Sequence, residues 1–136
     1  MVTPALAGAQ QVRKGIVVEN CGSISGALHF VISLKKVRPG KPLPTPRLHF
    51  SLDGAPGPLP NTWTLDKPAD RAVLTASRCE NSRPCDGAVS GTFRLDGLDA
   101  AGAFGAYDMV FAGNSREAGR FRVRRIPRDP KLGNCE

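Results

Sequence analysis

The chain has 136 residues, of which 40% are hydrophobic and 23% are charged, enough for one domain with its own apolar core. This hydrophobic share argues against a wholly disordered chain, and no apolar run approaches the ~20 residues that a membrane-spanning helix needs. The 19 Lys and Arg residues against 12 Asp and Glu give a net charge of +7, which favours anionic partners such as acidic glycans, lipid headgroups or nucleic acid.

The N-terminus, MVTPALAGAQ, contains the small-residue triplet Ala5-Leu6-Ala7. This triplet is similar to the end of a signal peptide, but no basic start and no full apolar stretch precede it. We therefore predict that residues 1–10 are an N-terminal tail or a signal-peptide remnant. Residues 11–136 are predicted to form a single all-β domain, because the apolar residues recur with a period of two almost throughout.

Two strands are predicted in the first part of this domain, over residues 12–20 and 27–37. The second is the most apolar and most β-branched stretch of the chain. Because such residues favour strands that are covered on both faces, we predict that 27–37 is a central strand.

The next predicted strand, residues 47–52, alternates cleanly, which places Leu48, Phe50 and Leu52 on its buried face. Seven of the twelve prolines fall between residues 39 and 60, on both sides of this strand. Because proline has no N–H to donate to a neighbouring strand, we predict that this is an edge strand flanked by stiff, extended loops.

The second half of the chain has further short, apolar or alternating segments. They are predicted as strands over residues 62–65, 72–79, 89–95 and 103–112. In the third of these, Val89, Phe93 and Leu95 are expected to point inward.

Tight turns are predicted at Asp86-Gly87, Asp96-Gly97 and Gly113-Asn114, because these residues tolerate a positive φ. No segment carries a long apolar stripe of helical period. Short strands with frequent turns are typical of sandwiches and barrels. We therefore predict an all-β fold, an antiparallel sandwich or a meander-type barrel of about eight strands, in which residues 88–126 form a meander.

The last predicted strand carries a row of arginines. Phe121 and Val123 alternate with Arg120, Arg122 and Arg124, and residues two apart in a strand lie on one face, roughly 6.6 Å from each other. Guanidinium groups bind phosphate, sulfate or carboxylate groups such as those repeated along a polymer. We therefore predict a surface that binds an anion or a partner. Its members are Arg120, Arg122, Arg124, Arg125, Arg128, Lys35 and Lys36, and Arg38 would extend it. The alternative is a solvent-facing strand that its charges keep unpaired.

Four cysteines, Cys21, Cys79, Cys85 and Cys135, allow three complete pairings. Cys79 and Cys85 enclose a short hydrophilic loop, so we predict two disulfides, Cys79–Cys85 and Cys21–Cys135. Zinc is the alternative, but the chain has no Cys-x-x-Cys spacing and no histidine close to a cysteine. Disulfides indicate an oxidising compartment, most simply a bacterial periplasm or the cell exterior.

The motifs give no catalytic, metal or cofactor site. His29 and His49 fall in strand patterns, and the chain has no Gly-x-Ser-x-Gly, Walker-type or His-Glu-x-x-His motif. With 6% aromatic residues, surface for stacking nucleic acid bases is sparse, so nucleic acid is not the expected partner.

We therefore expect a non-catalytic binding protein of the bacterial cell envelope or exterior. The expected partner is a glycan, a lipid headgroup or an acidic protein, the last bound as by an inhibitor or immunity protein. Arg83 and Pro84 at the tip of the disulfide-closed loop are a second predicted contact, because a closed loop loses less entropy on binding. Two alternatives stay open: a β-barrel carrier of a small apolar ligand, and a hydrolase with His29 or His49 in a cleft beside a serine or carboxylate.

Overall fold

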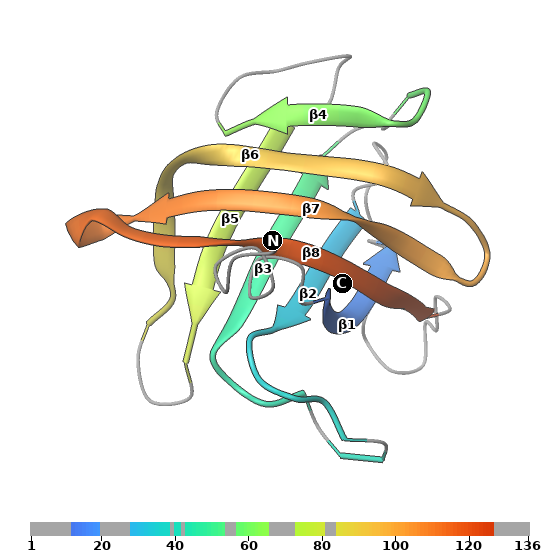
Figure 1. The fold of residues 1–136 in the computed structure, drawn as a ribbon, viewed down its shortest axis with the longest axis horizontal. Helices are drawn as coiled ribbons and strands as arrows, with labels where there is room; N and C mark the ends of the chain where they lie inside the picture. Colours follow the sequence, from blue (N-terminus) through green and yellow to red (C-terminus); the bar gives the residue numbers. More distant parts are fainter. Residues whose placement is uncertain are drawn as a thin grey trace, which may run out of the picture.

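The computed structural model describes residues 12–19, 28–38, 40–41, 43–53, 57–65, 73–80 and 84–126. Within these ranges the chain forms eight strands and one short 3-10 turn (Figure 1). The strands are β1 (Val12–Glu19), β2 (Leu28–Ser33), β3 (Arg47–Asp53), β4 (Asn61–Thr64), β5 (Val73–Cys79), β6 (Asp86–Leu98), β7 (Gly102–Phe111) and β8 (Ser115–Ile126). The turn η1 (Ala112–Asn114) joins β7 to β8, where a turn was predicted. In the described part of the chain, no helix has the length and apolar character to cross a membrane.

Seven of the strands close into a barrel in the order β1-β2-β3-β5-β6-β7-β8, and β4 pairs with β6 outside this ring (Figure 1). The predicted all-β fold is confirmed, as a barrel rather than a sandwich, and β6, β7 and β8 form the predicted meander. The prediction of a purely antiparallel sheet is wrong at one place. β1 and β8 run parallel and close the barrel, which no local pattern indicates because these strands come from opposite ends of the chain.

β3 is an inner strand, which corrects the prediction of an edge strand. It pairs with β2 on one side and with β5 on the other, antiparallel in both cases. The prolines all lie outside Arg47–Asp53, so they remove no ladder N–H from the strand itself. The alternation is as predicted: Leu48, Phe50 and Leu52 point into the barrel with at most 1% of their surface exposed.

β2 lies between β1 and β3, as predicted for this apolar stretch, but it ends at Ser33. The buried hydroxyl of Ser33 accepts a hydrogen bond from the N–H of Lys35 at 3.1 Å and donates to the carbonyl of Pro44 at 2.9 Å. The N–H of Leu34 donates to the carbonyl of Pro46 at 3.0 Å. These bonds tie both ends of the β2–β3 loop to the barrel, and that loop forms one wall of the candidate site.

β6 is a long, strongly curved strand that changes its neighbour along its length (Figure 1). Asp86 and Gly87 pair with β5, whereas Thr92–Leu95 pairs with β4. The change falls at Gly91, whose φ of 142° favours glycine. The carbonyl of Gly91 accepts a hydrogen bond from the N–H of Leu65, the residue that follows β4, at 3.0 Å.

The course of β6 corrects the prediction of two turns. Asp86-Gly87 and Asp96-Gly97 both lie inside the strand. The second pair coincides with a shift in the β6–β7 register between Leu95 and Gly97, so its glycine marks a β-bulge rather than a turn.

A second register shift, between Ala88 and Ser90, changes the direction of the intervening side chain. Val89, which was expected to point inward, is 62% exposed. Beyond the shift the predicted alternation holds, because Phe93 and Leu95 are fully buried.

Aromatic rings fill the barrel interior. The ring centroid of Phe93 lies 5.0 Å from that of Phe30 and 4.8 Å from that of Phe50. Phe121 stacks on the same ring at 5.2 Å, and Trp63 brings β4 into the same core. These aromatic rings pack together in the interior between the described strands.

Cys79 and Cys85 form the predicted disulfide, which joins the end of β5 to the residue before β6. Cys21 and Cys135, the second predicted pair, lie outside the described residues, as does the predicted tail over residues 1–10.

Candidate anion-binding groove

A groove of about 800 Å³ lies between the outer face of β1, β8 and β7 and the β2–β3 loop. We call it the basic groove. The side chains that give it positive charge are those of Lys14, Arg38, Lys41, Arg122 and Arg124.

Arg122 occupies the middle of the strand side of the groove. In the register it lies opposite Lys14 of β1 and Phe104 of β7. Because Phe121 and Val123 on either side of it point into the core, with 1% and 3% of their surface exposed, Arg122 points outward. Its guanidinium carbon lies 4.8 Å from the centroid of the Phe104 ring, a cation–π contact that restrains the direction of the side chain.

Arg124, two residues further along β8, has Ile16 of β1 and Gly102 of β7 as its register partners. Gly102 has no room for a side chain, because a Cβ there would lie 2.0 Å from the carbonyl oxygen of Val123. No side chain of β7 therefore stands opposite Arg124, which is exposed.

The β2–β3 loop forms the opposite wall. It contributes two apolar side chains, Val37 and Leu43, and two exposed cations, Arg38 and Lys41. Besides the bonds at the ends of β2 and β3, a guanidinium N–H of Arg13 on β1 donates to a carbonyl at the start of the loop at 2.9 Å. The groove is thus amphipathic, with cations and aliphatic side chains on both walls.

Among the described residues, Lys14, Arg122 and Arg124 form no ion pair. One carboxylate, that of Asp99, lines the groove, and it accepts hydrogen bonds from two backbone N–H groups of the turn before β7 at 2.8 and 3.1 Å. An anion entering the groove would therefore meet cations that form no ion pair with any described carboxylate.

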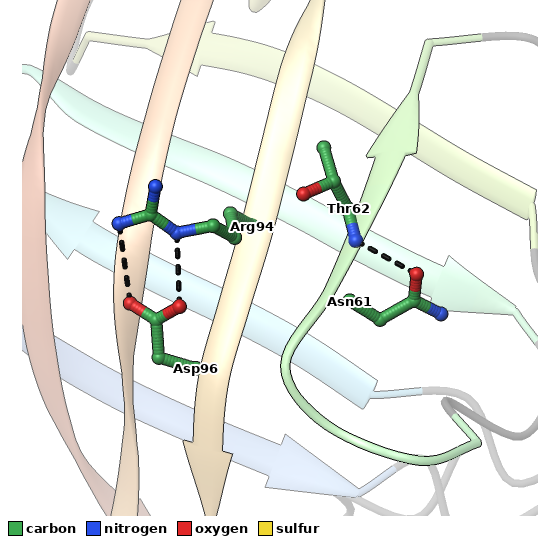
Figure 2. Close-up of polar contacts among 4 residues, drawn as sticks. All are labelled: Asn61, Thr62, Arg94 and Asp96. Atoms are coloured by element: carbon green, nitrogen blue, oxygen red, sulfur yellow. Dashed lines mark hydrogen bonds and ion pairs between the residues drawn. The ribbon is translucent and has the colours of Figure 1, made fainter.

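Two arginines that do not line the groove, Arg94 and Arg116, are paired. Arg94 of β6 donates to both carboxylate oxygens of Asp96, at 2.9 and 3.3 Å (Figure 2). Arg116 of β8 donates to Asp108 with Nε 2.8 Å from Oδ1, and this hydrogen bond holds the pKa of Asp108 below its usual range. The absence of such partners, within the described ranges, distinguishes the groove arginines from these two.

The predicted arginine row is placed as follows. Arg122 and Arg124 line the groove, whereas Arg120 is exposed on the same face of β8 but outside it. Arg125 lies outside the row, and its guanidinium donates to the carbonyl oxygen of Asp99 at 3.0 Å, so its role in the structure is to hold the turn before β7.

The other predicted contacts do not join the groove. Lys35 and Lys36 are exposed in the β2–β3 loop but do not line it. Pro84 is exposed beside the disulfide, and Arg83 and Arg128 lie outside the described residues.

Sequence reasoning missed two cations of the groove, Lys14 and Lys41, and gave Arg38 only as an extension. Lys14 reaches Arg122 through the parallel pairing of β1 with β8, and a parallel closing pair leaves no short-range signal. Arg38 and Lys41 reach the groove through the fold of a loop. The sequence does show a cluster of basic residues between 35 and 41, but it does not indicate which face of the barrel this loop covers.

A second, smaller depression of about 190 Å³ lies on the outer face of β2, β3 and β5. His29 and His49 line it together with Ser51, Thr75 and Ser77. The histidines are thus accessible beside serines, which is the condition set for the hydrolase alternative.

The described residues around this depression do not complete a catalytic triad. His49 is half-buried, and among the described groups its Nε2 is buried without a hydrogen-bond partner. Burial, and then the charges of Arg47 and His29, lower the pKa of His49 below 6.5. Among the described residues that line this depression there is no carboxylate, whereas a triad needs one to orient the histidine. Within the described ranges, no group of three His, Cys, Asp or Glu residues is placed to hold a metal ion.

Comparison of the chain with protein-family models, with curated proteins and with solved structures finds no match.

Proposed function

We propose that this protein is a non-catalytic binding protein that holds an anionic partner in the basic groove. The observation that carries the proposal is the row of Lys14, Arg122 and Arg124, which lies outward on adjacent strands and has no described ion-pair partner. Cations that need not break an ion pair first can bind an acidic group without that cost.

The proposed location is the bacterial periplasm or the cell exterior. The Cys79–Cys85 disulfide supports it, because structural disulfides persist in oxidising compartments. The net charge of +7 supports attraction of an anionic partner over distances comparable with the screening length.

The test is retention on an immobilised polyanion such as heparin across a salt gradient. Two double variants are compared with the unchanged protein: Arg122→Ser with Arg124→Ser, and Lys35→Ser with Lys36→Ser. Each removes two positive charges, but only the first pair lines the groove. We expect the groove variant to elute at clearly lower salt, with a flatter dependence of affinity on salt, because fewer contacts with anions are made. The control variant should elute close to the unchanged protein.

An equal shift of both variants would contradict the proposal. Retention would then depend on net charge alone, and the arginines of β8 would serve to keep the strand solvated.

A further inference from the structure

We infer that the basic groove takes a small amphipathic anion: an acid group bound by Lys14, Arg122 and Arg124, with an apolar body lying on the aliphatic part of the groove. This inference rests on the proposed function and names the chemical class of the ligand. It follows from the order of residues along β1 and β8, from the composition of the loop wall and from the size of the groove.

The two parallel strands change from cationic to apolar in the same direction. Along the outer face of β1, Lys14 is followed by Ile16, and along that of β8, Arg122 and Arg124 are followed by Ile126. In the parallel register Lys14 lies beside Arg122, Ile16 lies beside Arg124, and Val18 lies beside Ile126, so the pair changes from two cations to two apolar side chains through one mixed position.

The loop wall adds apolar surface opposite this gradient. Val37 and Leu43 line the groove from the loop, and Phe104, which is 39% exposed, lines it from β7. A highly hydrated polymer gains little from aliphatic side chains, whereas a hydrocarbon body gains free energy for each methylene removed from water.

The side chain proposed to bind the acid group is already ordered in the structure. The Arg122 guanidinium is already restrained over the Phe104 ring, so less side-chain entropy is lost when it binds an anion. Arginine forks bind carboxylate or phosphate groups through two parallel hydrogen bonds, and the neighbouring apolar surface strengthens such bonds by lowering the local dielectric.

The size of the groove fits a small molecule. Its volume of about 800 Å³ falls within the range of roughly 300–1,000 Å³ that is usual for small-ligand sites. The loop bounds it on one side, so the proposed occupant is a single molecule with one acid group and a hydrocarbon body.

The test uses dodecanoate as the probe, with binding measured by titration calorimetry at concentrations below micelle formation. Acetate, which has the acid group alone, and dodecyltrimethylammonium, which has the same chain with a positive head, are the control ligands. We expect dodecanoate to bind with one-to-one stoichiometry and at least about tenfold more tightly than either control, as the methylene and charge contributions together require.

Two groove variants separate the parts of the ligand. Arg122→Ser with Arg124→Ser should weaken dodecanoate binding and polyanion retention together. Val37→Ser with Leu43→Ser should weaken dodecanoate binding about tenfold or more and leave polyanion retention unchanged. A cooperative urea-unfolding transition shows that this variant is folded.

The outcomes distinguish the two proposals. Polyanion retention that depends on the groove arginines, with dodecanoate bound no better than acetate, would overturn this inference and leave the proposed function standing. Dodecanoate binding that neither variant changes would overturn the placement of the ligand. Equal binding of dodecanoate and dodecyltrimethylammonium would overturn the role of the cations. If the variant Val37→Ser with Leu43→Ser lost both polyanion retention and dodecanoate binding, the division between acid site and apolar surface would be overturned.

Discussion

The guanidinium carbon of Arg122 lies 4.8 Å from the centroid of the Phe104 ring, and the two residues face each other across the β7–β8 pair. This contact is on the outer face of the barrel, and both residues line the basic groove. It joins a cation proposed to bind ligand with an aromatic side chain that lines the same groove, so it is part of the site as well as of the fold.

The Arg122–Phe104 contact should contribute measurably to stability. We expect a double-mutant cycle with Arg122→Ala and Phe104→Ala to give a coupling free energy of about 0.5–1 kcal/mol in urea unfolding, the range for exposed cation–π pairs. Arg120→Ala combined with Phe104→Ala is the control, because Arg120 has Ala106 as its register partner on β7. A coupling as large in the control would show that the effect is not specific to the contact.

The central ring of the core should dominate stability. Phe93→Ala removes a fully buried ring that packs on three others, so we expect the free energy of unfolding to fall by about 3–5 kcal/mol. Phe104→Ala, at a position 39% exposed, should cost less than about 1 kcal/mol. Similar losses for both variants, measured by urea denaturation, would mean that the interior is not packed around Phe93.

The bend of β6 should depend on Gly91. A Cβ there would lie 2.4 Å from the carbonyl oxygen of Asp108, and the positive φ disfavours any other residue. We expect Gly91→Ala to lower the free energy of unfolding by more than about 2 kcal/mol. Gly87 lies in the same strand, and a Cβ added there would have no atom within 4 Å. Gly87→Ala should therefore change the free energy of unfolding by less than about 0.5 kcal/mol. A small effect of Gly91→Ala on the free energy of unfolding would contradict the bend at Gly91, where β6 changes its partner from β5 to β4.

His49 should make the fold less stable in mild acid. Burial lowers its pKa below 6.5 in the folded protein, and the charges of Arg47 and His29 act in the same direction. Below about pH 6.5 the unfolded chain therefore binds more protons at this position, so stability is lost as the pH falls through that value and levels off below the folded pKa. The free energy of unfolding, measured in steps from pH 8 down to about pH 5, should decline less in His49→Gln than in the unchanged protein. Identical pH profiles would show that His49 is not the group responsible.

The Cys79–Cys85 bond should stabilise the β5–β6 connection. In the chain-entropy model, a loop this short contributes about 2 kcal/mol through restriction of the unfolded chain. We expect the double variant Cys79→Ala, Cys85→Ala to lose roughly this amount in urea unfolding without reductant. If the double variant had the same free energy of unfolding as the unchanged protein, the disulfide would not stabilise the fold.

The sequence by itself determined which side chains point inward and which point outward in the regular strands. Leu48, Phe50 and Leu52 are buried, and Phe121 and Val123 are buried while the arginines between them face solvent. A period of two fixes these directions locally, because successive side chains of a strand point to opposite faces. The same reasoning failed at Val89, where an extra residue in β6 breaks the period.

Outside the β6-β7-β8 meander, only the tertiary structure decided which strands are neighbours. The prolines beside β3 suggested an edge, but pairing depends on the N–H groups within the strand, and the prolines lie outside it. The groove depends on the parallel contact of β1 with β8, which brings Lys14 beside Arg122, and on the fold of the β2–β3 loop. Local periodicity carries no information about contacts between residues far apart in the chain. The outward direction of the groove cations on β8 could therefore be predicted from the sequence, but their position beside Lys14 and the loop could not.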